Sequence, residues 1–203
     1  CLRVRLLSWP HPEYTVRFVV AVKVVVIFGF IWRMNQPVIM SEQDLRINGA
    51  IILNTPRKFS DFDLIDHRGD AFTLQRLKGQ WSMIFFGFTN CPDVCPTTLA
   101  TLNETYSKLK DSEKENLQII MVYLDPERDT VEKLGQYMPY FNAEFIGVTG
   151  NKHFIKRFTT EINIAYNQVP LDGDDYTVDH SSQIVLVNPN GHYHGFFKST
   201  HSA

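Results

Sequence analysis

The chain has 203 residues and a formal net charge of -2, from 20 basic and 22 acidic residues. This length is enough for one domain of moderate size plus an appendage. Residues 1–34 contain five of the basic residues and one acidic residue, which leaves 15 of the 20 basic and 21 of the 22 acidic residues in the remainder. The remainder is therefore net acidic, which argues against a nucleic-acid partner.

The first predicted element is an apolar run from Phe18 to Trp32, interrupted only by Lys23. Extended to residues 14–34, it reaches the roughly 20 residues needed to span a bilayer. Lys23 costs about 2.5 to 3.5 kcal/mol at the bilayer centre, and the surrounding Val, Ile and Phe residues offset that cost. We therefore expect residues 1–34 to form an N-terminal segment with a membrane anchor. A signal sequence and a buried element are the alternatives.

Basic residues flank this run mainly on its N-terminal side: Arg3, Arg5 and Arg17 precede it, and Arg33 follows it. The positive-inside rule then predicts a cytoplasmic N-terminus, with the globular domain on the other side of the membrane.

After the apolar run, residues 35–57 have a mixed composition that predicts a connector, and the globular domain is expected over residues 58–203. Short apolar or alternating runs predict strands, turn residues predict hairpins, and helical spacing predicts helices. The expected elements are a hairpin over 59–74, buried strands at 81–88 and 117–124, helices at 130–138 and 152–159, a short strand at 145–148, and a terminal hairpin over 184–197. This alternation predicts an α/β domain to which the hairpins add antiparallel strands.

Cys91 and Cys95 lie between the predicted strand at 81–88 and a helix-like stretch that follows. Unpaired N–H groups and the helix dipole favour a thiolate at such a turn. In one helical turn, the spacing of four would place both sulfurs on the same side, and a disulfide between them is also feasible. The alternative is a structural disulfide or a pair of inert buried thiols.

Two thiolates suit Cu(I), zinc or an iron–sulfur cluster. His180, far downstream, is a candidate third ligand. Two sulfurs and one imidazole nitrogen are compatible with copper in either oxidation state. Zinc fits less well because a structural zinc site usually takes four protein ligands.

Three segments in order resemble the Sco/SenC family, whose thioredoxin-like members help to assemble cytochrome c oxidase. Gly87–Pro96, with the sequence GFTNCPDVCP, resembles the copper-site motif of the family. Tyr123–Thr130 resembles its Asp-Pro-x-Arg-Asp-Thr turn, and Val178–Ser182 resembles its Asp-His-Ser stretch. The match runs from about Phe59 to Phe197. The resemblance implies a thioredoxin-like fold, with a central mixed sheet flanked by helices, and a Cu(I) or Cu(II) site formed by Cys91, Cys95 and His180.

The resemblance also implies a function: a membrane-tethered copper chaperone for the dinuclear copper centre of cytochrome c oxidase. Its domain would lie in the periplasm on an inner-membrane anchor, or in the intermembrane space if the protein is mitochondrial. The expected partners are the copper-bearing subunit of the oxidase, other copper chaperones and thioredoxin-like reductants.

Two other functions remain open. One is a thiol–disulfide oxidoreductase acting through Cys91 and Cys95, and the other is a redox or copper sensor. Dithiol exchange needs no imidazole ligand, so the role of His180 separates the oxidoreductase from the chaperone.

Other polar residues have less certain roles. Asp179 either orients the imidazole of His180 or carries surface charge. A cluster after the strand at 117–124 is expected either to dock a partner or to support the site; its members are Asp125, Arg128 and Asp129. The alternative is that Asp129 caps the next helix and Arg128 pairs with a neighbouring carboxylate. His192 and His194 alternate on one face of a predicted strand, which we expect to be plainly exposed; a secondary metal site is the alternative.

Family members usually continue into a closing helix after the terminal hairpin. The chain leaves no room for one after Phe197, so we expect this C-terminal helix to be missing and apolar sheet surface to be uncovered there. Cys1 is left without an assigned role.

Overall fold

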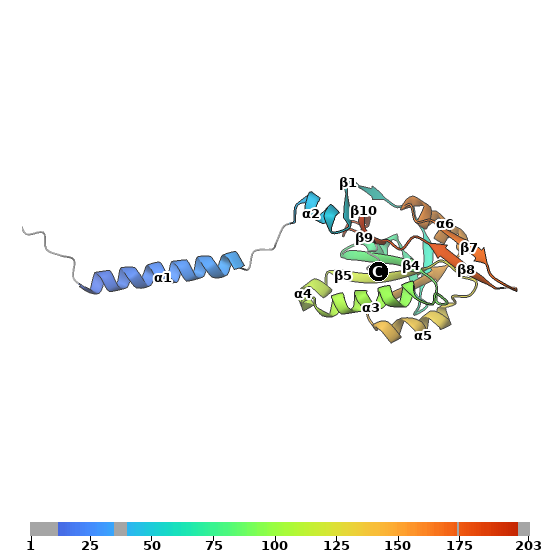
Figure 1. The fold of residues 1–203 in the computed structure, drawn as a ribbon, viewed down its shortest axis with the longest axis horizontal. Helices are drawn as coiled ribbons and strands as arrows, with labels where there is room; N and C mark the ends of the chain where they lie inside the picture. Colours follow the sequence, from blue (N-terminus) through green and yellow to red (C-terminus); the bar gives the residue numbers. More distant parts are fainter. Residues whose placement is uncertain (1–11, 35–39, 174, 199–203) are drawn as a thin grey trace, which may run out of the picture. The chain divides into compact units, whose positions relative to one another are not determined.

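The computed structural model describes residues 12–34, 40–173 and 175–198. The chain divides after Ser41 into two units, and each is described by itself (Figure 1). In chain order the elements are α1 (Pro12–Met34), α2 (Glu42–Ile47), β1 (Ala50–Lys58), β2 (Asp63–Asp66), β3 (Ala71–Thr73), the 3₁₀ turn η1 (Leu74–Leu77), β4 (Trp81–Gly87), α3 (Val94–Ser107), α4 (Asp111–Lys114), β5 (Leu117–Tyr123), α5 (Val131–Phe141), β6 (Ile146–Gly150), α6 (Lys152–Glu161), β7 (Tyr166–Pro170), β8 (Tyr176–His180), β9 (Ile184–Val187) and β10 (His192–Phe197).

Helix α1 contains 23 residues. At about 1.5 Å per residue it is about 34 Å long, close to the roughly 30 Å hydrocarbon core of a bilayer. Among the described residues it is the one helix that is long and apolar enough to cross a membrane, and a signal sequence near the N-terminus would have the same features. Arg3 and Arg5, on which the predicted orientation partly depends, lie outside the described residues, as does Cys1.

The second unit is built on an eight-stranded sheet with the order β1-β10-β9-β4-β5-β6-β2-β3. Strands β4, β5 and β6 are parallel, and the remaining neighbours are antiparallel. Parallel neighbours need crossover connections, which α3 and α5 provide between these three strands. The predicted α/β architecture, a central mixed sheet flanked by helices, is therefore confirmed (Figure 1).

The central strands β4 and β5 are mostly apolar, with one polar residue each, Ser82 and Gln118, because both of their faces are buried. On one face, Ile84 and Phe86 of β4 pack in a core cluster with Phe158 of α6. On the other face, Phe85 of β4 packs in a second cluster with residues of α3 and α5. The predicted strands at 81–88 and 117–124 are therefore confirmed as β4 and β5 to within one residue.

The predicted connector over residues 35–57 is wrong in its C-terminal part. Residues 42–47 form α2, and β1 pairs with β10 at the edge of the main sheet, so the folded unit begins at Glu42 rather than at residue 58. Pro56 lies where the register of β1 shifts, as expected for proline in an edge strand. Gly195 of β10 pairs with Ile52 of β1. A Cβ atom at position 195 would lie 2.3 Å from the Ile51 carbonyl oxygen, so the two strands can lie this close only because residue 195 is a glycine.

The β7–β8 hairpin is an element that the sequence analysis did not predict. It forms a two-stranded sheet of its own, with Tyr166 paired to His180 and Pro170 paired to Tyr176. Five of its ten strand residues are β-branched or aromatic, but Asn167, Gln168 and Pro170 interrupt the pattern in β7. This hairpin carries the candidate ligand His180 at its C-terminal end.

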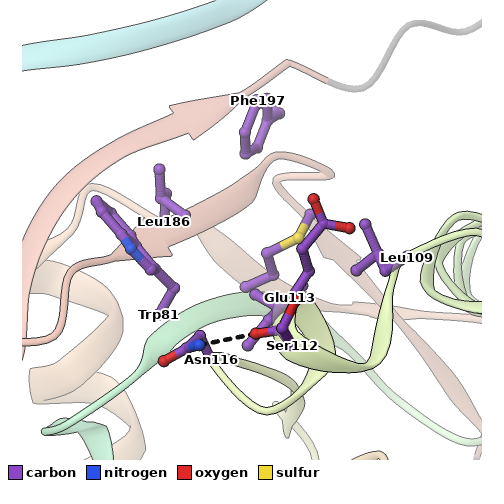
Figure 2. A pocket seen from close by; sticks show the side chains of 9 residues that line it. Trp81, Leu109, Ser112, Glu113, Asn116, Leu186 and Phe197 are labelled. Carbon is purple, nitrogen blue, oxygen red and sulfur yellow. Dashed lines mark hydrogen bonds between the residues drawn. The ribbon is translucent and has the colours of Figure 1, made fainter. Parts of the chain in front are cut away.

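An apolar groove of about 460 Å³ lies over the sheet beside α4. Figure 2 shows Trp81 and Leu186 facing Leu109 across it, with Phe197 nearby and the Asn116 amide donating to the Ser112 carbonyl at 2.7 Å. The groove is bordered by side chains of β4, β9 and β10, together with residues of α4.

Candidate metal centre

The two candidate cysteines lie beyond the C-terminal end of β4, where α/β folds commonly place functional groups. Helix α3 begins at Val94, so Cys95 is in its first turn and Cys91 is in the preceding loop. A cavity of about 220 Å³ is lined by both this loop and the end of β8. Its lining residues are Phe88, Cys91, Pro92, Val94, Thr177, Val178, Asp179, His180 and Ser182. The larger groove beside α4 is lined by no cysteine or histidine. The smaller cavity is therefore the candidate site.

The three predicted ligand residues come together here: Cys91 and His180 line the cavity, and Cys95 is buried next to them. One sulfur from each of Cys91 and Cys95 and one ring nitrogen of His180 lie within 4.8 Å of one another, and no other such group of His, Cys, Asp or Glu occurs in the described part of the chain. The Cys95 Sγ atom lies 3.7 Å from His180 Nε2. Metal–ligand bonds of about 2.0 to 2.3 Å place two ligands of one ion about 3 to 4.5 Å apart. The donor set therefore fits a single soft metal ion after a small closure.

Both cysteines are free thiols with different environments. Cys95 is completely buried, and Cys91 is half-buried. Burial raises the pKa of the Cys95 thiol, and the hydrogen bond with Cys91 raises it further. The expectation of a thiolate at the helix start is therefore wrong for Cys95 in the metal-free protein, because desolvation outweighs the helix terminus. The N–H of Cys95 donates to the Cys91 sulfur at 3.4 Å.

Gly87, the last residue of β4, makes room for the Cys95 sulfur. A Cβ atom at this position would lie 2.5 Å from Cys95 Sγ and 2.8 Å from Met121 Cε. Both distances are far below van der Waals contact, so a larger residue would displace the sulfur or the methionine. The glycine in the GFTNCPDVCP segment thus positions one of the candidate ligands.

The imidazole of His180 is oriented by the backbone. Its Nδ1 lies 3.1 Å from the Ser181 carbonyl oxygen, which can only accept a hydrogen bond, so Nδ1 carries the proton. The lone pair of Nε2 then faces the sulfurs and is free to bind a metal. Asp179 is exposed and adjacent to His180 on the strand, so its side chain points to the other face. The orienting role suggested for Asp179 therefore belongs to the Ser181 carbonyl.

Asp129 was one candidate for the cap of the following helix, and the structure corrects this. Thr130 caps α5, because its side chain accepts from the Lys133 N–H. Asp129 is 1% exposed and accepts hydrogen bonds from Thr89, through the N–H at 3.2 Å and through the hydroxyl. Burial raises the pKa of Asp129, and the bonds from Thr89 oppose that shift.

His192 and His194 do not join the candidate site. His194 is half-buried, with its ring edge-to-face with Trp81 at 5.1 Å, and His192 is also half-buried. The expectation of a plainly exposed face is therefore wrong for both.

The fold and the site together define a thioredoxin-like domain in which a strand-to-helix turn brings two cysteines and a histidine together. The family model described as SCO1/SenC matches residues 53–203. A putative copper-binding protein of Stutzerimonas stutzeri is 33% identical over 165 residues, which are 80% of this chain and 81% of that protein. An SCO2-like protein of Rickettsia conorii is 42% identical over 135 residues, which are 66% of this chain and 65% of that protein. The chain belongs to the SCO1/SenC family.

Solved structures agree with this assignment. The crystal structure of Arabidopsis thaliana ScoI with copper bound matches with a TM-score of 0.65 and 33% identity, covering 70% of this chain and 89% of that one. A second structure is that of BsSco, a member of the Sco family of cytochrome c oxidase assembly proteins in which a disulfide switch was identified. It matches with a TM-score of 0.60 and 25% identity, over 74% of this chain and 89% of that one.

Proposed function

We propose that this protein is a membrane-tethered copper metallochaperone that helps to assemble the dinuclear copper centre of cytochrome c oxidase. The observation that carries the proposal is the convergence of two cysteine sulfurs and one ring nitrogen of His180 within 4.8 Å of one another. The copper-binding relative and the copper-bound structure of Arabidopsis ScoI support the same metal.

The donor chemistry favours copper over zinc. Thiolates select Cu(I), and imidazole adds a nitrogen donor that Cu(II) prefers. A structural zinc site would take a fourth protein ligand. In the described part of the chain, the cluster contains three ligand residues. Cys91, Cys95 and His180 are therefore proposed as the copper ligands.

Copper is cargo in this proposal, and its release requires access by a partner. Cys91 is half-buried, whereas Cys95 is completely buried. An incoming thiolate of the copper-bearing oxidase subunit would therefore compete for the ion at the Cys91 side of the cavity. Other copper chaperones would load the site by the same route, and thioredoxin-like reductants would keep the two cysteines reduced.

The proposed location follows from α1 and its flanking charges. Helix α1 is long and apolar enough to anchor the chain in a membrane. Basic residues concentrated before it favour a cytoplasmic N-terminus. The domain would then lie in the periplasm, or in the intermembrane space of a mitochondrion, on the side where the oxidase receives copper.

Metal analysis of the full-length chain in detergent tests the proposal. One copper per chain is expected, with sulfur-to-Cu(II) charge transfer in the absorption spectrum. A Cys91→Ser, Cys95→Ser double variant should lose both, and a His153→Ala variant should keep both because His153 is an exposed residue of α6. Unchanged stoichiometry and charge transfer in the double variant would refute the ligand assignment.

A thiol–disulfide oxidoreductase is the second candidate function. It is favoured by two free cysteines of unequal accessibility, since an accessible thiol can attack a partner disulfide and a buried thiol can resolve the mixed disulfide. This reaction would use Cys91 and Cys95 without His180. Reduction of an oxidised cysteine pair in the oxidase subunit by the copper-free protein tests it directly.

A further inference from the structure

The turn Asp125–Asp129, which follows β5, contacts both segments that carry the candidate ligands. We call residues 88–95, with the two cysteines, the cysteine arm, and residues 175–180, with His180, the histidine arm. The turn is closed by two backbone hydrogen bonds to the Asp125 carbonyl, from the N–H of Arg128 at 3.1 Å and from the N–H of Asp129 at 2.8 Å. The Asp125 and Asp129 carboxyl groups are both about 1% exposed. Buried carboxylates remain in a fold when they are paired or hydrogen-bonded, so their partners show what the turn holds.

Asp129 holds the cysteine arm. It accepts the N–H and the hydroxyl of Thr89, which lies two residues before Cys91. Asp129 is itself fixed to the sheet, because the Thr149 hydroxyl of β6 donates to its carbonyl at 3.0 Å. The loop that presents Cys91 is thus connected to β6 through Asp129.

Arg128 and Asp125 hold the histidine arm. Arg128 Nη1 donates to the Tyr176 carbonyl and to Asp175 Oδ1, both at 2.9 Å, while its Nε pairs with Asp125. The Tyr176 hydroxyl donates to Asp125 Oδ1 at 2.8 Å, and the guanidinium lies 3.7 Å from the centre of the Tyr176 ring. Tyr176 is the first residue of β8, and His180 is the last.

These contacts matter because the β7–β8 hairpin forms no ladder with the main sheet. Val178 packs into the core from this hairpin. The guanidinium of Arg128 bonds the start of β8 through Nη1 and Asp125 through Nε, and the single nitrogen of an ammonium group cannot occupy both positions. The distance from His180 to the sulfurs therefore depends on Arg128 and Asp125.

We propose that Asp125, Arg128 and Asp129 are positioning residues that preorganise the copper site, with Asp129 setting the cysteine arm and the Arg128–Asp125 pair setting the histidine arm. This inference rests on the proposed copper function. The two arms have different consequences. Two thiolates satisfy Cu(I), whereas Cu(II) also needs the imidazole. Loosening the histidine arm should therefore lower the Cu(II) affinity selectively. Loosening the cysteine arm should lower the affinities for both Cu(I) and Cu(II).

The test measures Cu(I) and Cu(II) affinities by chelator competition, using the full-length chain in detergent. Arg128→Gln is expected to weaken Cu(II) about 10- to 100-fold, the usual range for residues that orient metal ligands, and Cu(I) less than about threefold. Arg128→Lys keeps the positive charge but lacks the several nitrogen donors of the guanidinium. It should therefore recover only part of the Cu(II) affinity that Arg128→Gln loses. Thr89→Val removes one bond to Asp129 and should weaken both ions by similar factors.

Two further variants keep the test sharp. Tyr176→Phe removes only the hydroxyl bond to Asp125 and leaves the ring under the guanidinium, so it serves if Arg128→Gln does not fold. Glu127→Gln is the matched control in the same turn, because the Glu127 side chain is 61% exposed and pairs only with Lys152 at 3.1 Å. It should change neither affinity.

Hydrogen exchange of the copper-free protein separates this inference from the proposed function. Amides of β8 should exchange faster in Arg128→Gln and Tyr176→Phe than in wild type and Glu127→Gln, whatever metal the site binds. If wild type binds no copper, the proposed function fails and the exchange result still tests the positioning role. Equal losses for Cu(I) and Cu(II) in Arg128→Gln, or unchanged β8 exchange, would overturn the inference.

Discussion

Cys95 Sγ and His180 Nε2 lie 3.7 Å apart although 85 positions separate the two residues in the chain. The sulfur comes from the first turn of α3, and the nitrogen comes from the end of a hairpin outside the main sheet. This separation lies within the range expected for two ligands of one ion, so the two atoms are placed to bind the same soft metal ion.

Replacing His180 by alanine should separate the two candidate functions. Cu(II) affinity should fall far more than Cu(I) affinity, because two thiolates still satisfy Cu(I). Oxidation of the Cys91–Cys95 pair should be spared, since dithiol exchange needs no imidazole ligand. Chelator competition for each ion and a thiol assay measure these effects, with His153→Ala as the control.

Equal losses for both ions in this variant would show that His180 is not a selective ligand. No loss for either ion would rank the thiol oxidoreductase above the copper chaperone.

Gly87→Ala should damage the site without removing any ligand. The new Cβ atom would lie 2.5 Å from Cys95 Sγ, so the sulfur or Met121 must move. We expect a stability loss of about 1 to 3 kcal/mol, typical of overpacking, together with weaker binding of both copper ions. Thermal denaturation and chelator competition measure the two effects.

Gly135→Ala is the matched control for Gly87→Ala. Gly135 lies within α5, and its added Cβ atom would meet the His67 carbonyl oxygen at an ordinary 3.4 Å. This variant should bind copper normally. Normal copper binding by Gly87→Ala as well would contradict the proposed role of Gly87.

Alkylation of the copper-free protein should modify Cys91 before Cys95. Cys91 is half-buried, Cys95 is completely buried, and burial raises the pKa of the Cys95 thiol. The thiolate is the reactive form, so labelling of Cys95 should increase as the pH rises towards that raised pKa. Mass spectrometry after brief treatment with iodoacetamide at several pH values resolves the two sites. Preferential labelling of Cys95 at neutral pH would contradict the unequal roles of the two thiols.

The orientation of α1 can be tested with reporter fusions after Ser41, which leave α2 and the folded unit out of the fusion. Arg17 and the basic residues before it predict a cytoplasmic N-terminus, so a reporter that works only in the periplasm should be active. Activity of a cytoplasm-dependent reporter instead would contradict the proposed delivery role and favour a cytosolic thiol function.

Local sequence patterns predicted the centre of the fold better than its edges. Strands β4 and β5 are nearly continuous apolar runs because both of their faces are buried, and that signal is contained in each segment. Strand β1 was missed because its order depends on pairing with β10, which lies far away in the sequence. The β7–β8 hairpin was missed because Asn167, Gln168 and Pro170 interrupt the pattern of β7; contacts with Arg128 and core packing of Val178 hold the hairpin in place.

Local sequence patterns likewise predicted the residues of the candidate site but not their environments. The cysteine motif and the Asp-His-Ser stretch indicated which residues to bring together, and the structure brings them together. A helix-start rule favoured a thiolate at Cys95, but burial has the opposite and larger effect there. Burial is a property of the assembled core, which the local sequence does not contain. The bond from Thr89 to Asp129 joins two loops 40 positions apart and is equally hidden from local patterns.

X-ray absorption spectroscopy of the copper-loaded, full-length protein tests the central claim most directly, because it counts the sulfur and nitrogen atoms bound to the metal. For wild type we predict two sulfur atoms and one imidazole nitrogen per Cu(II), and loss of the nitrogen alone in His180→Ala. A wild-type copper shell of nitrogen and oxygen only, or a shell unchanged by His180→Ala, would contradict the assignment of Cys91, Cys95 and His180 as the copper ligands.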